Sequence, residues 1–259
     1  MAVAAEGAST YANALAPHGS LYIKQTRKGC LQELLGCDAN SEFKIATKED
    51  PKTDLFYAIE ETNFCIRLIC KNQRPLTMSV HNGPDASAPV MLTIDRPFRC
   101  PIGACKCCCF QEVSVRDAAT GTKLGGAKEK FYCCPVPLFQ VLEGDKALYD
   151  LQMPTCCGGF CVNVCKEGLC NCKIPFYLYE PGKRDAELGS IIKEWGGLGA
   201  ELFTTADKFS VTFPEGATPE TKAAIWSAVM LLDYNFFEGQ GGMQGMGAGG
   251  APKNEEMER

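Results

Sequence analysis

The sequence predicts a mainly β protein, a sandwich or barrel of antiparallel strands, with one apolar helix near its C-terminal end. Three observations predict this class. About ten to twelve short segments of alternating apolar and polar residues follow one another, separated by Pro and Gly. A single apolar helical segment comes after all of them. The 259 residues are 46% hydrophobic and 22% charged, as expected for a folded globular chain.

The elements follow in chain order. Residues 1–28 show no sustained period and are predicted to be a flexible leader before a domain that spans 29–238. A short helix is expected at 30–35, ended by Gly36. The predicted strands cover 41–45, 55–61, 76–82, 89–97, 111–117, 123–129, two segments within 139–152, 174–180, 187–195 and 208–214. Turns are expected at the ATGT sequence of 119–122 and at Gly144.

The last element is a helix predicted over about 219–238. Thr218 suits the N-cap, Pro219 the first helical position, and Glu220 the first turn, where a carboxylate interacts favourably with the helix dipole. Residues 223–232 are apolar on all sides, so this helix is expected to run through the centre of a barrel. Ten apolar residues are about half of a bilayer span, which favours a core helix over a membrane helix. Its buried members are predicted to be Ile225, Trp226, Val229, Met230 and Leu232. The Gly- and Met-rich residues 239–259 are expected to be disordered.

Charge and composition exclude several classes of function. A net charge of −5 argues against a generally basic nucleic-acid surface, so no nucleic-acid partner is expected. Only two histidines, His18 and His81, are present, which makes a His-ligated metal enzyme or a His-dependent triad hard to build. The first twenty residues lack the pattern of a secretory signal, so a reducing compartment without disulfides is expected.

The chain is rich in cysteine, with 17 residues, and the densest group is Cys105, Cys107, Cys108 and Cys109. Three interpretations compete for these thiols. The interpretation that these thiols fill a core is weak, because neighbouring residues of a strand face opposite sides, so at least one of Cys107 and Cys108 must point outward. Zinc binding needs four converging thiolates, and this spacing is unusual for it. Acylation needs exposed thiols beside apolar and basic residues, which are supplied by Phe110, Arg96, Arg99 and Lys106.

A second cysteine group leaves two interpretations open. Cys161, Cys165, Cys170 and Cys172 have an irregular but compact spacing. Four thiolates on one hairpin would form a Zn²⁺ site. Alternatively, these thiols fill a core, because cysteine is among the most frequently buried residues.

Six ordered segments carry a resemblance to a known family. They cover 31–45, 56–70, 96–115, 189–197, 202–214 and 222–238. In these segments the chain resembles the phospholipid scramblase family of membrane-associated proteins. The resemblance implies a tubby-like fold, a closed antiparallel barrel of twelve strands around a buried C-terminal helix. It also implies covalent palmitate on the cysteines at 105, 107, 108 and 109.

The resemblance further implies an EF-hand-like Ca²⁺ segment at 205–216, and here the sequence departs from the expected pattern. The ligand positions fall on Thr205, Asp207, Phe209, Phe213 and Gly216, with Glu215 one place early. Few of these are carboxylates, so Ca²⁺ binding at Thr205, Asp207, Phe209 and Glu215 is expected to be about millimolar or weaker. Alternatively, this stretch is simply the last strand, with Phe209, Val211 and Phe213 facing inward.

Two functions remain in competition. The first is ATP-independent, bidirectional movement of phospholipids between leaflets, stimulated by Ca²⁺. The second is a peripheral adaptor, anchored by acyl chains, that binds anionic lipid or a protein partner without transport. Both imply a phospholipid membrane as partner, at the cytoplasmic face and most simply the plasma membrane, and neither implies a bond-making enzyme. The first would require either that the helix leave the barrel and span the bilayer or that barrels self-associate and thin it. A plugged barrel poses a difficulty for transport, because a headgroup crossing hydrocarbon needs a polar path.

Overall fold

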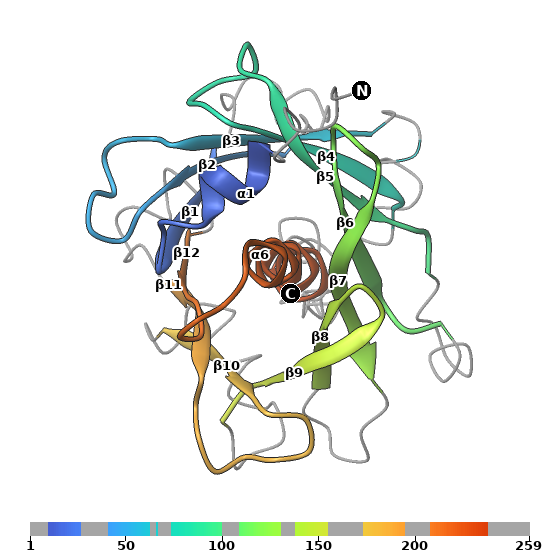
Figure 1. Ribbon diagram of the computed structural model, residues 1–259. Coiled ribbons are helices and arrows are strands. Elements are labelled where there is room, and N and C mark those ends of the chain that lie inside the picture. The colour runs from blue at the N-terminus through green and yellow to red at the C-terminus, as the bar shows by residue number, and fades with distance from the viewer. Residues whose placement is uncertain are drawn as a thin grey trace, which may run out of the picture.

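Twelve antiparallel strands close into a barrel around one helix (Figure 1). The computed structural model describes residues 10–26, 41–62, 66, 74–99, 109–130, 138–154, 173–194 and 208–237. Each strand pairs with its neighbours in the chain, and the first strand closes the barrel against the last. The strands are β1 (Ser20–Thr26), β2 (Glu42–Ala46), β3 (Phe56–Glu61), β4 (Leu76–His81), β5 (Val90–Arg96), β6 (Glu112–Asp117), β7 (Lys123–Lys130), β8 (Leu138–Glu143), β9 (Lys146–Gln152), β10 (Ile174–Tyr179), β11 (Gly189–Glu194) and β12 (Lys208–Thr212). The predicted closed barrel is confirmed.

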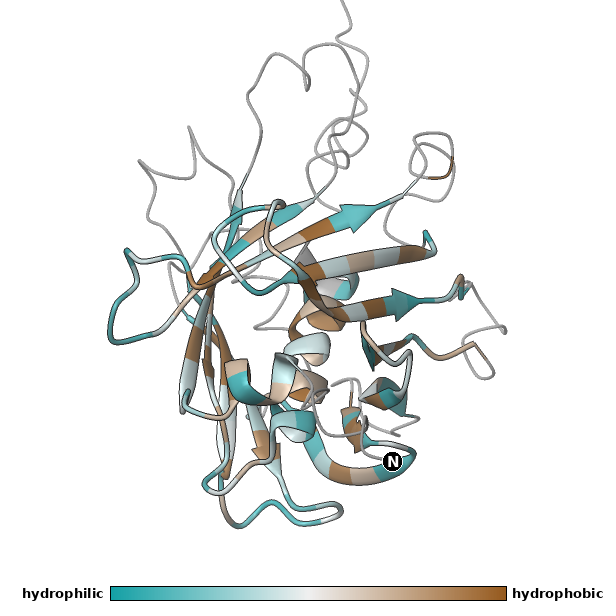
Figure 2. Cartoon of the chain, turned by 45° about the horizontal axis from the view of Figure 1, so that its top comes forward, coloured by the Kyte–Doolittle hydropathy of each residue, from teal (hydrophilic) through white to brown (hydrophobic). Residues whose placement is uncertain are grey.

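The alternation that predicted the strands is visible in the structure. Along β4, for example, Leu76, Met78 and Val80 are buried while the residues between them are partly exposed. Figure 2 shows the same alternation of apolar and polar residues along the strands. The turns at Gly121 and Gly144 also lie where they were expected, and both residues have positive φ, of 70° and 57°, which glycine adopts without strain.

The predicted flexible leader differs from the structure. Residues 10–26 contain the helix α1 (Thr10–Leu15) and the strand β1. Leu21 and Ile23 of β1 are fully buried, and β1 pairs with both β2 and β12. The alternation of apolar and polar residues in β1 covers only a few positions. The strand is stabilised by pairing with β12, which lies near the other end of the domain. No local sequence pattern reports such a pairing.

The central helix α6 (Pro219–Leu232) begins as predicted. The Thr218 hydroxyl oxygen accepts a hydrogen bond of 3.1 Å from the backbone N–H of Thr221, and Pro219 occupies the first turn. The α-helix ends earlier than predicted, at Leu232, and continues as the π-helix η3 (Asp233–Phe237). The five side chains singled out from the sequence as buried, Ile225, Trp226, Val229, Met230 and Leu232, are each at most 1% exposed.

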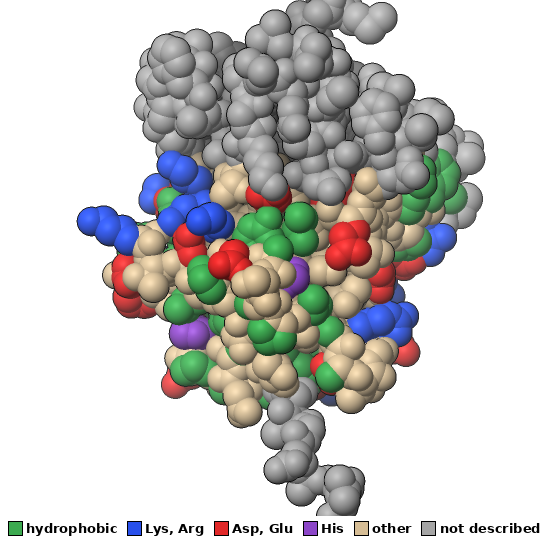
Figure 3. Space-filling view, turned by 90° about the horizontal axis from the view of Figure 1, so that it is seen from above, with side chains coloured by type: hydrophobic (Ala, Val, Ile, Leu, Met, Phe, Trp, Pro, Cys, Tyr) green, Lys and Arg blue, Asp and Glu red, His purple; other side chains and the backbone are tan. Residues whose placement is uncertain are grey.

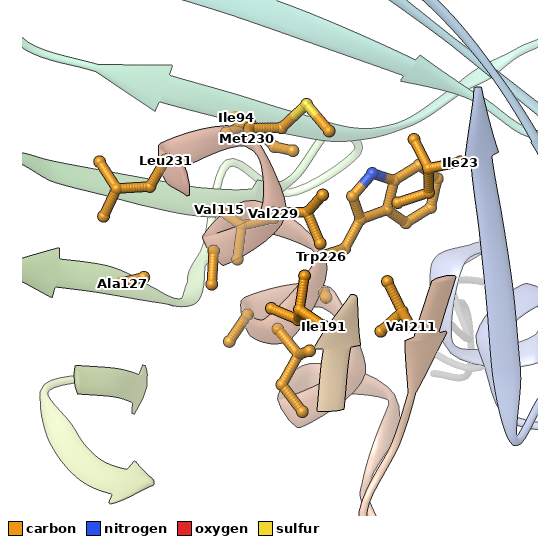
Figure 4. Packing of buried hydrophobic residues seen from close by; sticks show 14 of the residues in the cluster. Ile23, Ile94, Val115, Ala127, Ile191, Val211, Trp226, Val229, Met230 and Leu231 are labelled. Carbon is orange, nitrogen blue, oxygen red and sulfur yellow. The ribbon is translucent and has the colours of Figure 1, made fainter. Parts of the chain in front are cut away.

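The helix lies at the centre of the barrel, as the end-on view in Figure 1 shows. The ring of Trp226 packs 5.8 Å from that of Phe56 in β3, and Figure 4 shows its indole pointing toward Ile23 of β1. On the other side the helix approaches β7 closely at Gly125. A methyl group there would lie 3.2 Å from the Cβ of Ala224 and 2.1 Å from the carbonyl oxygen of Leu142. Glycine is therefore required at the closest approach of wall and helix.

Candidate functional site

A buried charged cluster attaches the end of the central helix to the barrel wall. Arg74, just before β4, donates from Nε and Nη2 to the two carboxylate oxygens of Glu60 in β3, both at 2.7 Å. Tyr234 of η3 donates its hydroxyl proton to the same carboxylate at 2.9 Å. Burial alone would raise the pKa of Glu60, but the hydrogen bonds and charge of Arg74 hold that pKa below its ordinary value. Glu60 is therefore ionised and fully paired at neutral pH.

A second arginine extends this cluster to the base of the segment between β5 and β6. That segment carries the cysteines at 105, 107, 108 and 109, and we call it the cysteine loop. Arg96, at the end of β5 and 2% exposed, donates from Nη2 to the side chain of Gln111 at 2.7 Å. The same nitrogen donates to the side chain of Asn235 in η3 at 3.3 Å. The guanidinium groups of Arg74 and Arg96 lie 5.0 and 5.5 Å from the centre of the Tyr234 ring, within cation–π distance. The helix end and the loop base thus share one connected set of side chains.

The cysteine loop connects β5 to β6, and its two ends are held together. The Gln111 side chain donates to the carbonyl oxygen of Arg99 at 3.0 Å, and Arg99 forms an ion pair with Glu112. Cys109 is a partly exposed free thiol. The other three predicted acylation sites, Cys105, Cys107 and Cys108, lie outside the described residues.

Two large apolar side chains that follow β3 and β5 in the chain are exposed. Phe98, which follows β5, is 52% exposed, and Ile66 is 38% exposed. Both are large side chains that a folded chain usually buries. Ile66 and Pro97, the residue before Phe98, line the same hollow of the barrel wall. We group Ile66, Phe98, Arg99 and Cys109 as the candidate site and call it the apolar rim.

The opposite end of the central helix is fixed by α1. Lys222 is 7% exposed, and its Nζ donates to the carbonyl oxygens of Leu15 at 3.1 Å and Ala16 at 2.8 Å. Burial lowers the pKa of Lys222. Tyr11 of α1 donates its hydroxyl proton to the Glu220 carboxylate at 2.8 Å. Both ends of the helix are therefore held inside the barrel by polar contacts.

The predicted Ca²⁺ residues do not come together among the described positions. Thr205 and Asp207 lie outside the described residues. Phe209 is fully buried within β12, whereas Glu215 is exposed in the turn before α6. Phe209, Val211 and Phe213 are all buried in the core, which agrees with the alternative interpretation of this stretch as the last strand. Ca²⁺ binding stays a prediction.

The zinc candidates Cys161, Cys165, Cys170 and Cys172 lie outside the described residues, so zinc binding stays a prediction. Elsewhere, in the part of the chain that the structure describes, no group of three or more potential metal ligands is found. No helix within those same residues combines the length and apolar character that crossing a bilayer demands.

Surface charge on the visible face agrees with the composition. Figure 3 shows that basic and acidic side chains are interspersed there, with apolar side chains between them.

The buried charged cluster was missed at the level of the sequence, although a signal for part of it exists. Phe56, Ala58 and Glu60 share one face of β3 by the period of two, so Glu60 had to point into the core. A carboxylate in such a position needs a buried cationic partner. The pattern does not say which arginine provides it, because Arg74 lies outside any strand.

Comparisons with known proteins agree with this architecture. The family model described as Scramblase matches residues 5–239. The chain is 31% identical to phospholipid scramblase 1 of Mus musculus over 211 residues, which cover 82% of this chain and 59% of the relative. It is 31% identical to phospholipid scramblase 2 of Homo sapiens over 210 residues, which cover 80% of this chain and 64% of the relative. The chain thus spans about six-tenths of the length of these relatives. No solved structure matches it significantly.

Proposed function

This chain belongs to the scramblase family, and from that premise we propose that it moves phospholipids between bilayer leaflets in both directions without ATP. The names of its relatives point to a lipid translocator rather than to a bond-making catalyst. The observation that carries the mechanism is the central helix, which is held at one end by Lys222 and at the other by Tyr234. Lipids therefore pass outside the barrel and not through it.

The reason lies in the cost of releasing the helix. Withdrawal of Tyr234 would leave Glu60 and Arg74 without one of their buried partners. Withdrawal of Lys222 would leave the carbonyl oxygens of Leu15 and Ala16 without the hydrogen bonds that they accept from it. Each unpaired buried polar group costs about 1–3 kcal/mol, and a charged group costs more. Vacating the barrel would also expose the apolar inner faces of its strands. Self-association of barrels on the membrane surface, which thins the bilayer locally, is the less costly route.

The apolar rim supports docking on a membrane. Ile66 and Phe98 present exposed apolar side chains, and Cys109, the one predicted palmitoylation site that the structure describes, is partly exposed. Two or more acyl chains make a stable anchor, whereas one gives only marginal binding. We place palmitate on Cys105, Cys107, Cys108 and Cys109, and the protein on the cytoplasmic face of the plasma membrane.

A second function, that of an acyl-anchored adaptor without transport, is favoured by one observation. The closed barrel is filled by an apolar helix, and a headgroup has no polar route through such a centre. The adaptor would bind anionic lipid or a protein partner at the same rim.

A leaflet-exchange assay separates the two functions. Purified protein is placed in liposomes with a fluorescent lipid, and an impermeant quencher is added with and without millimolar Ca²⁺. Quenching beyond the outer half of the lipid supports transport, and dependence on Ca²⁺ supports a site around Asp207. Quenching that stops at half refutes transport and leaves the adaptor.

The anchor is tested by replacing Cys105, Cys107, Cys108 and Cys109 with Ser. We expect the variant to leave membranes during a carbonate wash, because the acyl chains are lost. The matched control replaces Cys133 and Cys134 with Ser and is expected to stay bound. A quadruple variant that remains on the membrane would refute the anchor.

A further inference from the structure

The outer wall of the barrel carries a hollow of about 520 Å³ that lies across β3 to β8. One row of register-paired residues crosses its floor, each on a neighbouring strand from β3 to β7: Glu61, Thr77, Asp95, Ser114 and Gly126. The row continues to Leu142 on β8. Because side chains alternate along a strand, these residues all share the outer face of the sheet.

The hollow exists because the middle of this row is small. Gly126 contributes no side chain, and a methyl group there would lie 2.2 Å from the carbonyl oxygen of Val113. Ser114 lies next to it in the row and contributes only a small hydroxyl side chain. Thr77, further along the row, donates its hydroxyl proton to Asp95 at 3.0 Å. Leu142, which lies outside the core cluster, supplies an apolar wall at one end. The side chains of the floor are thus short, and Ser114 offers a hydroxyl donor.

Charged side chains of both signs form the walls. The basic residues at its surface are Arg116, Lys123 and Lys128, and the acidic residues are Glu61, Asp95 and Glu112. Arg96 also belongs to the lining, but it is 2% exposed and its guanidinium bonds to Gln111 and Asn235 in the interior. Without Arg96, the numbers of basic and acidic groups are equal, so the side chains that face the hollow carry no net formal charge. A polyanion would meet three carboxylates here, whereas a ligand with one phosphate and one ammonium group finds a partner for each charge.

The basic groups differ in whether they already have an acidic partner. Arg116 lies 3.4 Å from Asp95, and Lys123 lies 2.6 Å from Asp145. Within the described part of the chain, no carboxylate oxygen lies at ion-pair distance from Lys128, although Glu112 is its cross-strand neighbour. Arg99 holds Glu112 instead. Lys128 is therefore the group most ready to receive a phosphate.

The position of the hollow points to a lipid as the carrier of that phosphate. Ile66 and Pro97 belong to the lining, and the exposed Phe98 comes next in the chain. A headgroup in the hollow would therefore lie beside the apolar side chains of Ile66 and Pro97, so that its acyl chains remain in the bilayer. A free phosphoester has no acyl chains, so apolar side chains in the lining would not favour its binding.

We propose that the hollow binds the zwitterionic headgroup of a phospholipid, with the phosphate at Lys128 and Ser114 and the ammonium group toward Asp95 and Glu112. This inference rests on the proposed function, since the bound lipid is the one to be moved. It gives the outer surface of the barrel a defined place where a headgroup can leave the water.

The test measures binding to nanodiscs of phosphatidylcholine, to nanodiscs with added phosphatidylinositol bisphosphate, and to soluble glycerophosphocholine. The variants are Lys128→Ala, which removes the phosphate partner, and Ser114→Phe, which fills the hollow from its floor. Lys130→Ala is the matched control, because Lys130 is exposed on the same strand and is not part of the lining. Unfolding curves establish that each variant folds.

We expect both hollow variants to weaken binding to phosphatidylcholine nanodiscs about tenfold, and Lys130→Ala to leave it unchanged. Unchanged binding in Lys128→Ala and Ser114→Phe would overturn the proposal. A loss confined to the bisphosphate nanodiscs would assign a polyanion instead, and a loss confined to glycerophosphocholine would assign a soluble phosphoester; either result refutes the lipid headgroup proposed here. Wild-type binding without leaflet exchange would refute transport but not the hollow.

Discussion

The hydroxyl group of Tyr234 donates a 2.9 Å hydrogen bond to the Glu60 carboxylate, and this contact joins the end of the central helix to strand β3. Glu60 is fully buried and Tyr234 is 1% exposed, so water cannot replace either partner. The two residues are 174 positions apart in the chain. The contact therefore reports directly whether the helix end is seated in the barrel.

Removal of this hydroxyl should destabilise the fold. We expect Tyr234→Phe to lower the free energy of unfolding by about 1–3 kcal/mol, because one acceptor position of a buried carboxylate is left empty. Urea denaturation measures the change. Tyr177→Phe is the control, since Tyr177 is only half-buried and makes no hydroxyl contact within the described residues. Equal stability of the two variants would show that the contact contributes nothing.

The same carboxylate makes stability depend on pH. The pKa of Glu60 is lowered in the folded state, whereas an unfolded Glu titrates near pH 4.3. Its stabilising contribution is thus complete above about pH 4.3 and is lost as the pH falls through the lower, folded pKa. Glu60→Gln should be less stable than the wild type at pH 7 and should lose less on acidification. Urea unfolding at pH 7 and pH 3 measures both effects, and parallel losses in the two proteins would contradict them.

Gly125 should tolerate no side chain. We expect Gly125→Ala to lower the free energy of unfolding by about 1–3 kcal/mol or more, since the new methyl group would meet the Leu142 carbonyl oxygen. The added substitution Ala224→Gly should not restore stability, because it relieves only the contact with the helix. Gly19→Ala is the control, because a methyl group there has no neighbour within 4 Å. Thermal unfolding compares the variants, and rescue by Ala224→Gly would refute the clash with the strand backbone.

Gln111 should keep the base of the cysteine loop closed. Gln111→Leu removes the hydrogen bonds to Arg96 and to the Arg99 carbonyl oxygen. We expect faster trypsin cleavage after Arg99 in this variant, because local opening becomes easier. Gln152→Leu removes a similar hydrogen bond, to Arg184, from a different part of the barrel and serves as the control. Identical cleavage rates in both variants would contradict a clamp at Gln111.

Local pattern was sufficient for most of the barrel. The strands β2 to β12 lie within or next to predicted segments, because each has a buried face that imposes a period of two. The helix start was equally readable, since Thr218 and Pro219 act on neighbouring backbone groups. Strand β1 was not predicted, because its role in closing the barrel depends on β12, which is distant in the sequence.

The candidate site was only partly accessible from the sequence. The apolar and basic neighbours of Cys109 are local, so the cysteine loop could be singled out. The clamp by Gln111 depends on the Arg96 side chain of β5 and on the backbone carbonyl oxygen of Arg99. The attachment of Tyr234 depends on Glu60, which Arg74 holds. Such contacts form only when segments far apart in the chain are brought together, and one sequence does not report their pairing.

The position of α6 in the chain has a consequence for biosynthesis. The helix follows every strand, yet it fills the centre that the strands surround. A nascent chain that ends before Pro219 therefore contains the sequences of all twelve strands but lacks the helix that packs against their apolar inner faces. We expect the barrel to close only after the helix has left the ribosome. Until then the strands expose unpaired edges and apolar faces that favour aggregation. We therefore expect the domain to depend on chaperones during synthesis and to be sensitive to premature termination.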